Sequence, residues 1–322
     1  MCYSAQVLAD YRKFVRQFGA VMDLREFWNT VWTRTNRPEA RVKIPKSMEM
    51  AFADSQTDLE REIKAGIDAF AAHEAIRIEQ ELFTQRTRLV EAERKLAVKT
   101  TKAASESARI AAAKIETARG WLADLKRTEL EDRDSRIFPG MWAPVIVFED
   151  GRRVVKPMRY QCRPAGKPAF HDAKFPGTYN ARRDNLEGFW KGMFGRTHGL
   201  MVLNAFYENV KRHNVEGRAL APGEAEENLV LEFRPRPTQD MLVACLWSRW
   251  RSPAGDEELL SFAAITDEPP PEIAAADHDR CIIPIKPEHV DAWLQPDPRH
   301  LRALYAILDD RERPYYEHRL AA

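Results

Sequence analysis

Between about residues 54 and 136, apolar side chains recur every three or four positions, as they do along one face of an amphipathic helix. A first stripe runs through Leu59, Ile63, Ile67, Phe70, Leu82, Leu89 and Leu96, and a second through Ala108, Ala111, Ile115, Ala118, Leu122 and Leu125. The stretch contains no proline and only two glycines. We predict two long antiparallel helices that bend within residues 99–105.

Beyond this stretch the pattern changes to short apolar or alternating runs separated by proline and glycine, which is typical of strands. Residues 141–160 predict a β-hairpin that turns at Asp150 and Gly151, since Asp-Gly favours tight hairpin turns. Further strands are predicted at 199–207, 228–233, 241–247 and 261–266, and helices at 287–294 and 300–308. Residues 1–36 predict a strand and then a helix, and residues 37–53 a connection.

These elements predict an α+β protein with a strand-rich core of antiparallel sheets and flanking helices, into which a long helical hairpin is inserted. The core would comprise residues 1–53 and 135–322, the second part ending in helices, and the inserted arm residues 54–134. With 322 residues the chain is long enough for a substantial core. Three interpretations of the arm stay open: an interaction arm, a structural hairpin with a solvated charged face, or a direct contact with DNA.

Charge and cysteine content narrow the functional classes. The net charge is +1, so any surface that binds nucleic acid must be local. The four cysteines lie far apart without a CxxC pair, which disfavours a zinc ribbon and a disulfide scaffold and suits a reducing compartment. No apolar run is long enough to span a bilayer, and the N-terminus lacks the pattern of a secretion signal. We therefore expect a cytoplasmic protein without membrane contact, cofactor or metal.

One segment, residues 152–196, departs from the overall charge balance. It holds eleven Lys or Arg residues and three acidic ones, a net charge of +8. Five aromatic residues are interleaved with these charges: Tyr160, Phe170, Tyr179, Trp190 and Phe194. Cations that neutralise phosphates and rings on which bases stack are the groups that bind single-stranded nucleic acid. The alternative is a solvated surface whose aromatic side chains belong to the core.

The second residue is a cysteine, and removal of Met1 would leave Cys2 with a free α-amine and a thiol on adjacent carbons. Such an aminothiol condenses with an aldehyde to an imine, and its thiol then closes a five-membered thiazolidine ring. Both groups titrate near neutral pH, so a useful fraction of each is nucleophilic. By itself a cysteine at this position is weak evidence for a function.

Four short motifs accompany the Met-Cys start. They are RIFPGMWAPVIV at 136–147, an Asn-Ala-Arg triplet with Asn180 and Arg182, a strand ending in Phe-Tyr-Glu with Glu208, and a His-Asp-Arg triplet with His278. Together these resemble the SOS response-associated peptidase family, the abasic-site processing proteins that shield damaged single-stranded DNA. The resemblance covers residues 1–36 and roughly 135–295, with 54–134 as an insertion.

The resemblance implies a role for each matching residue. Cys2 would join the ring-opened sugar aldehyde of an abasic site, and Asn180 would hold the new N-terminus and the sugar by hydrogen bonds. Glu208 would shuttle protons during imine formation and self-removal of the first methionine, His278 would aid ring opening, and Arg182 would bind a phosphate. The implied partner is single-stranded DNA with abasic sites, at the nucleoid after damage. We expect a monomer.

The sequence also departs from the family pattern. Tyr3 and Ser4 stand where members usually continue Gly-Arg, which removes an early phosphate-binding arginine. Arg159 and Arg163 are the candidates to compensate for it. The predicted DNA-binding residues are Arg159, Arg163, Arg182, Arg183 and Trp190.

Simpler interpretations remain for single residues and for the whole chain. Asn180 can be a turn residue, Glu208 a surface acid and His278 a structural histidine. For the chain, one alternative is an N-terminal-nucleophile peptidase or amidase that uses Cys2 and Glu208 without a role at DNA. Another is a repair scaffold whose arm, residues 54–134, recruits a protein partner.

Overall fold

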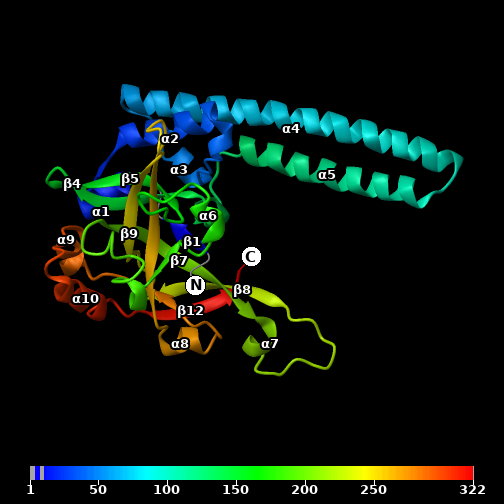
Figure 1. Cartoon of the computed structure of the whole chain (residues 1–322). Coiled ribbons are helices and arrows are strands. Elements are labelled where there is room, and N and C mark those ends of the chain that lie inside the picture. Colours follow the sequence, from blue (N-terminus) through cyan, green and yellow to red (C-terminus); the bar gives the residue numbers. More distant parts are fainter. Residues whose placement is uncertain (1–3, 8–10, 322) are drawn as a thin grey trace. The chain divides into compact units, whose positions relative to one another are not determined.

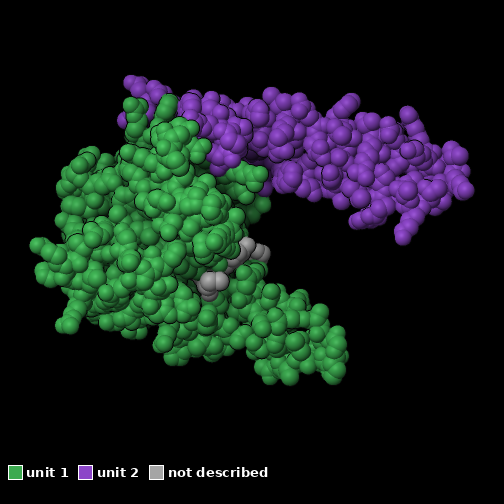
Figure 2. Space-filling model, viewed as in Figure 1, with its two compact units in different colours: residues 1–30, 41–51, 131–322 green, residues 31–40, 52–130 purple. Residues whose placement is uncertain are grey.

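The computed structural model describes residues 4–7 and 11–321, and the chain divides into two compact units (Figure 2). Unit 1 comprises residues 1–30, 41–51 and 131–322, and unit 2 comprises residues 31–40 and 52–130. The boundary between the units falls within helix α2 (Leu24–Asn36). Where the sequence suggested an arm of 54–134, unit 2 ends at residue 130 and also takes in part of α2.

Twelve strands of the described residues form one sheet, which dominates unit 1 (Figure 1). They are β1 (Ser4–Val7), β2 (Val21–Met22), β3 (Arg136–Ile137), β4 (Trp142–Glu149), β5 (Arg152–Tyr160), β6 (Asn180–Arg182), β7 (His198–Lys211), β8 (Asn228–Arg236), β9 (Met241–Arg251), β10 (Glu258–Asp267), β11 (Cys281–Ile282) and β12 (Tyr315–Leu320). Most pairings are antiparallel, whereas β10 pairs in parallel with β5 and β6, and β2 in parallel with β5.

Five of the long strands pair in a closed ring, in the order β7, β4, β5, β10, β9 and back to β7. Successive side chains alternate between two apolar clusters, with Val145 and Met201 on one face and Ile146 and Leu200 on the other. The helices α1 (Tyr11–Phe18), α9 (Val290–Leu294) and α10 (Leu301–Asp309) contribute to the second cluster. Because both faces are buried, these strands appear in the sequence as nearly continuous apolar runs.

The structure confirms the predicted α+β class and most of its elements. Residues 1–36 differ from the prediction, since β2 separates two helices, α1 and α2, and the predicted connection contains a short helix at residues 46–50. The strand β12, after the last helices, was not predicted. Asp150 and Gly151 join β4 to β5, and both have the positive φ that a two-residue turn of this kind requires. The four further predicted strands are β7 to β10, each longer than predicted, and the C-terminal helices lie where the pattern placed them. The shorter helical elements are η1 (Pro38–Ala40), α3 (Lys46–Met50), η2 (Asp132–Ser135), α6 (His171–Lys174), η3 (Arg183–Asn185), α7 (Arg212–Val215), α8 (Pro271–Ala274) and η4 (Pro287–His289).

Unit 2 consists mainly of α4 (Asp58–Val98) and α5 (Lys102–Lys126), which form the predicted antiparallel hairpin (Figure 1). A capping box at Thr57 satisfies backbone N–H groups at the start of α4. Along the hairpin, apolar residues such as Leu82 of α4 and Ile115 of α5 form a separate small core. No helix in the described part of the chain is sufficiently long and apolar to cross a membrane.

Candidate functional site

Glu208 and His278 are far apart in the sequence but form a buried contact in unit 1. Oε2 of Glu208 and Nε2 of His278 are 3.1 Å apart, and the two side chains are 1% and 8% exposed. Nδ1 of His278 lies 2.8 Å from the carbonyl oxygen of Arg280. Since a carbonyl oxygen only accepts hydrogen bonds, Nδ1 carries a proton and donates it.

The proton on Nδ1 limits which atoms can donate a hydrogen bond between His278 and Glu208. With Nδ1 protonated, Nε2 of a neutral ring is an acceptor, and so is an ionised carboxylate. A hydrogen bond between these two atoms therefore needs one proton, either on Nε2 of His278 or on the carboxyl group of Glu208. Such a pair can take a proton from one reacting group and deliver it to another, which is general acid and base chemistry near neutral pH.

The strand β7 positions Glu208. Its side chain lies on the same face as Phe206 and Val210, which belong to the first apolar cluster. In such surroundings a lone charge is costly, and the imidazole offsets that cost. The strand β1 pairs with β7 so that Ser4 lies opposite Tyr207. The first described residue of the chain is therefore next to the residue that precedes Glu208.

The loop after α8 holds His278. Its backbone N–H donates to the carbonyl oxygen of Ile273 at 3.3 Å, and the preceding residue, Asp277, has a left-handed conformation with φ 64°. Aspartate tolerates this conformation better than most residues. The carboxylate of Asp277 also accepts a hydrogen bond from Nδ2 of Asn214, in α7, at 2.6 Å. The turn at Asp277 and its hydrogen bond with Asn214 together position the imidazole of His278 next to Glu208.

Asn180 lies at the start of β6, opposite Ala264 on β10. Its side chain is buried, yet neither its amide oxygen nor its amide nitrogen has a hydrogen-bond partner among the described residues. The same is true of the buried hydroxyl of Thr266, opposite Arg182 on the same pair of strands. Unpaired buried polar groups are costly, and they mark positions suited to binding a polar ligand. Sequence analysis missed Thr266 because threonine is an ordinary strand residue.

The predicted nucleophile, Cys2, lies outside the described residues. The other three cysteines are Cys162, Cys245 and Cys281, and all are buried free thiols. Burial raises the pKa of Cys162 to about 12. Burial also raises the pKa of Cys245, and burial together with the Glu208 carboxyl raises the pKa of Cys281. Because the thiolate is the nucleophile, none of these three is a candidate for nucleophilic chemistry.

Trp190 is buried, and the partly buried Arg159 and Arg163 are both paired with an acidic side chain. The two arginines converge on Asp172, with N–O distances of 2.8 and 2.5 Å, and Arg163 also lies 4.4 Å from the ring of Trp250. Burial raises the pKa of Asp172, but hydrogen bonds from the guanidinium groups outweigh it, so its pKa is lowered. Trp190 is 3% exposed within the second apolar cluster. That these three residues contact DNA stays a prediction.

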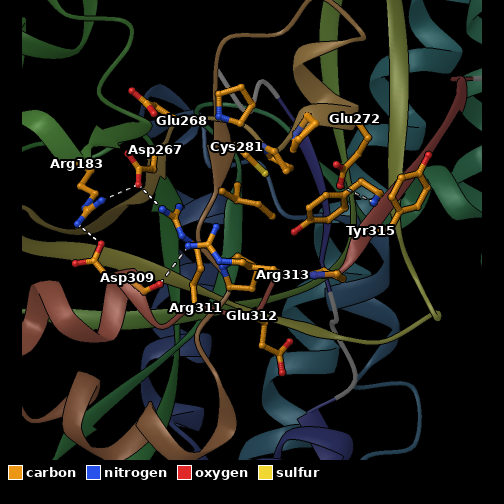
Figure 3. A pocket seen from close by; sticks show the side chains of 17 residues that line it. Arg183, Asp267, Glu268, Glu272, Cys281, Asp309, Arg311, Glu312, Arg313 and Tyr315 are labelled. Carbon is orange, nitrogen blue, oxygen red and sulfur yellow. Dashed lines mark hydrogen bonds and ion pairs between the residues drawn. The ribbon is translucent and has the colours of Figure 1, made fainter.

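Arg182 and Arg183 differ in their surroundings. Arg182 is about half exposed and pairs with a neighbouring aspartate. Arg183 lies in the wall of a cavity of about 770 Å³, where Asp267, at 3.1 Å, and Asp309 share its guanidinium (Figure 3). Arg311 also binds Asp267 in this cavity. Acidic side chains outnumber the arginines around this cavity, and Arg182 is therefore the more available cation for a phosphate.

Three exposed phenylalanines form a feature that sequence analysis only partly found. Phe170, Phe175 and Phe189 are 66, 42 and 37% exposed. The rings of Phe175 and Phe189 lie 4.7 and 6.0 Å from the buried ring of His171, and Nζ of Lys174 is 5.5 Å from the Phe175 ring. We call Phe170, Phe175 and Phe189 the phenylalanine surface. The sequence singled out Phe170, but only the fold shows that the other two rings are exposed.

Fold and site together define an α+β protein whose sheet carries a buried carboxyl–imidazole pair. Residues 94–319 match the model of the SOS response associated peptidase (SRAP) family. Because this match spans more than half of the chain, the chain belongs to the SRAP family, and the resemblance found in the sequence is confirmed. The name of the family connects it with the SOS response to DNA damage and with a peptidase-like role.

Three solved structures align with 58% of this chain. A protein from Bordetella bronchiseptica is 18% identical, with 87% of its chain covered and a TM-score of 0.46. A protein from Bacteroides thetaiotaomicron is 15% identical, with 78% covered and a TM-score of 0.45. A phage-related protein from Bordetella bronchiseptica is 20% identical, with 81% covered and a TM-score of 0.43. No curated protein matches the sequence.

Proposed function

We propose that this chain captures abasic sites in single-stranded DNA by forming a covalent thiazolidine through Cys2. After Met1 is removed, the α-amine adds to the ring-opened sugar aldehyde, water leaves, and an imine forms. The thiol of Cys2 then adds to the imine carbon, which creates a C–S bond, and its proton passes to the nitrogen. The observation that carries this proposal is the buried contact between the carboxyl group of Glu208 and the imidazole of His278.

Each step moves protons that this pair can carry. The amine loses a proton as it adds to the aldehyde, and the departing hydroxyl gains one to leave as water. The buried amide of Asn180 and the hydroxyl of Thr266 are suited to hydrogen-bond the α-amine and the sugar oxygens. Hydrolysis of the Met1–Cys2 bond needs the same transfers, so Glu208 and His278 would also serve the peptidase-like role.

Covalent geometry supports Cys2 as the nucleophile. Ser4 lies opposite Tyr207, the residue before Glu208. Consecutive Cα atoms are about 3.8 Å apart, so the Cα of Cys2 is at most about 7.6 Å from that of Ser4. Arg136 secures this start of β1, since its Nε donates to Oγ of Ser4 at 3.0 Å and its guanidinium lies 3.8 Å from the Tyr207 ring.

The phenylalanine surface supports single-stranded DNA as the substrate. Exposed rings stack on unpaired bases of any sequence, and Lys174, beside Phe175, and the half-exposed Arg182 can neutralise phosphates. The loop that carries two of the three rings is closed by a hydrogen bond from the N–H of Cys162 to the carbonyl oxygen of Thr178 at 2.9 Å. Asn180 lies two residues after Thr178, so the loop that carries these rings leads along the chain into a residue of the candidate site.

Intact-mass measurement tests the proposal. The purified protein is incubated with a single-stranded oligonucleotide that carries one abasic site, and spectra are recorded before and after. We expect loss of Met1 beforehand and one DNA adduct per chain that survives denaturation. The Cys2→Ser variant should bind intact single strands almost normally but form no adduct. An adduct of unchanged yield in this variant would show that Cys2 is not the nucleophile.

The name of the family favours a second candidate, an N-terminal-nucleophile peptidase or amidase that uses Cys2 without a role at DNA. Salt separates the two functions. If exposed cations neutralise phosphates, the logarithm of the DNA affinity should fall linearly with that of the salt concentration, by about 0.7 for each phosphate contacted. Absent or salt-independent DNA binding, together with cleavage of N-terminal peptide or amide substrates, would favour the hydrolase.

A further inference from the structure

The helix α4 carries a second apolar row that the hairpin does not use. Ile76, Phe83 and Val90 recur every seven residues and are 56, 75 and 45% exposed. Ala69 and Ala97 continue the row by one heptad at each end, and both are exposed. A seven-residue apolar repeat supplies one of the two positions per heptad through which one helix packs along another.

The second row lies roughly opposite the face of α4 that packs against α5. The packed face carries Ile78, Leu82 and Leu89. Because an α-helix turns by about 100° per residue, Phe83 projects roughly 120° away from the middle of that face. A surface helix normally has a single apolar stripe. The helix α4 is therefore apolar on two sides, and its outer side is suited to a further contact.

The charges beside the row match a second α4 helix that runs in the opposite direction. Glu79 and Arg86 flank Phe83 on one side, are exposed, and have no ion-pair partner among the residues that the structure describes. In an antiparallel pair centred on Phe83, Glu79 would lie beside Arg86 of the second copy, and this contact would occur twice. On the other side, Gln80 and Thr87 would meet in the same way. A parallel pair would place Glu79 and Arg86 beside the flank of the second copy that carries Gln80 and Thr87, so these charges would stay unpaired.

The apolar positions have the same symmetry. An antiparallel pair would set Phe83 against its own counterpart and Ile76 against Val90 of the second copy. The alanines at positions 69 and 97 would face each other and let the helices approach closely. A two-fold axis requires this kind of self-complementary surface, on which each contact is repeated with the residues exchanged.

We propose that the outer face of α4 binds a second copy of this chain, in an antiparallel helix pair whose two-fold axis passes near Phe83. The paired segment runs from Ala69 to Ala97, about 42 Å at 1.5 Å per residue. This proposed dimer differs from the monomer that was expected from the sequence. It does not depend on the proposed reaction at Cys2, since every residue involved belongs to unit 2.

Sedimentation of the full-length protein over a range of concentrations tests the dimer. We expect a reversible monomer–dimer equilibrium for the wild type. Phe83→Glu should raise the dissociation constant at least about tenfold, because two carboxylates would meet at the axis. Trp121→Glu is the matched control, since it replaces another exposed aromatic side chain of the hairpin, 51% exposed on α5, outside the row. Circular dichroism checks that both variants keep their helices.

A wild type that stays monomeric at high concentration would overturn the proposal. So would a dimer that Phe83→Glu leaves intact, or that Trp121→Glu weakens equally. A disulfide experiment tests the direction of pairing. Phe83→Cys should give an oxidised dimer beyond the wild-type background, and so should the double variant Ile76→Cys/Val90→Cys. Ile76→Cys alone should not, whereas efficient crosslinking by this single variant would show that the helices are parallel and the proposed arrangement is wrong.

Discussion

His198 and His278 are both buried beside the sheet, and Nδ1 of each ring donates to a backbone carbonyl oxygen, but their second nitrogens meet different groups. Nδ1 of His198 lies 3.0 Å from the carbonyl oxygen of Trp293, and its Nε2 accepts a hydrogen bond from the N–H of Gly195 at 2.8 Å. Nε2 of His278 meets the carboxyl group of Glu208. One ring is bonded only to groups that do not titrate, and the other faces a group that does.

This difference separates a structural histidine from one that can act in catalysis. Burial lowers the pKa of His198 to about 3, and the hydrogen bond to Trp293 offsets this only in part. The ring is therefore neutral at physiological pH, and Phe194 and Trp293 pack against it. Nε2 of His278 instead faces a carboxyl group, a chemical group that can exchange a proton with an imidazole. The partner of the second nitrogen, and not burial itself, indicates which ring can transfer protons.

Among the proposed substitutions, a change at the Glu208–His278 pair should have the largest effect on the rate of adduct formation. The glutamine in Glu208→Gln keeps the shape of the side chain but cannot take up or release a proton. We expect adduct formation with abasic single-stranded DNA to slow at least about hundredfold, since general acid–base catalysis contributes about 10²–10⁴-fold. Single-turnover reactions resolved on denaturing gels measure the rate. A rate within about fivefold of the wild type would show that this pair does not carry the protons.

Substitution of His198 should lower the stability of the protein and leave the rate of adduct formation almost unchanged. His198→Ala leaves the N–H of Gly195 buried without its acceptor and opens space between Phe194 and Trp293. We expect the free energy of unfolding to fall by about 2–3 kcal/mol, measured by urea denaturation. The adduct rate of the folded variant should stay within about twofold of the wild type. A large loss of rate at full folding would remove the distinction between the two histidines.

The lowered pKa of His198 should also make the stability of the protein depend on pH. Since the pKa of His198 is about 3 when folded and 6.5 in the unfolded chain, only the unfolded chain binds this proton between these values. The stabilisation is complete above about pH 6.5 and is lost as the pH falls towards 3. Between pH 7 and pH 5 the wild type should lose about 2 kcal/mol more than His198→Ala. Equal losses in urea titrations would contradict a strongly lowered pKa.

The sequence revealed one side of this comparison better than the other. His278 belongs to a recognisable His-Asp-Arg triplet, whereas His198 opens an apolar strand without any motif. Apolar or alternating runs and turn residues predicted the hairpin and the four long strands, because strands that are buried in a sheet require apolar side chains at regular positions. Spacing could not show that Asp172 binds two arginines, or that the hydroxyl of Thr266 is buried, because both depend on how separate segments meet in the fold.

His171, a third buried histidine, extends the comparison to DNA binding. Among the described residues neither of its ring nitrogens has a hydrogen-bond partner, and burial lowers its pKa, so the ring acts as a neutral support for the phenylalanine surface.

Phe175→Ala should weaken binding of intact single strands by about 1 kcal/mol, the lower end of the range for one stacked base. Fluorescence anisotropy measures the affinity, with Tyr315→Ala, an exposed ring on β12, as the control. At saturating DNA the adduct rate of Phe175→Ala should equal that of the wild type, because the ring binds bases and moves no protons. Equal weakening by both substitutions would instead show that stacking is not confined to the phenylalanine surface.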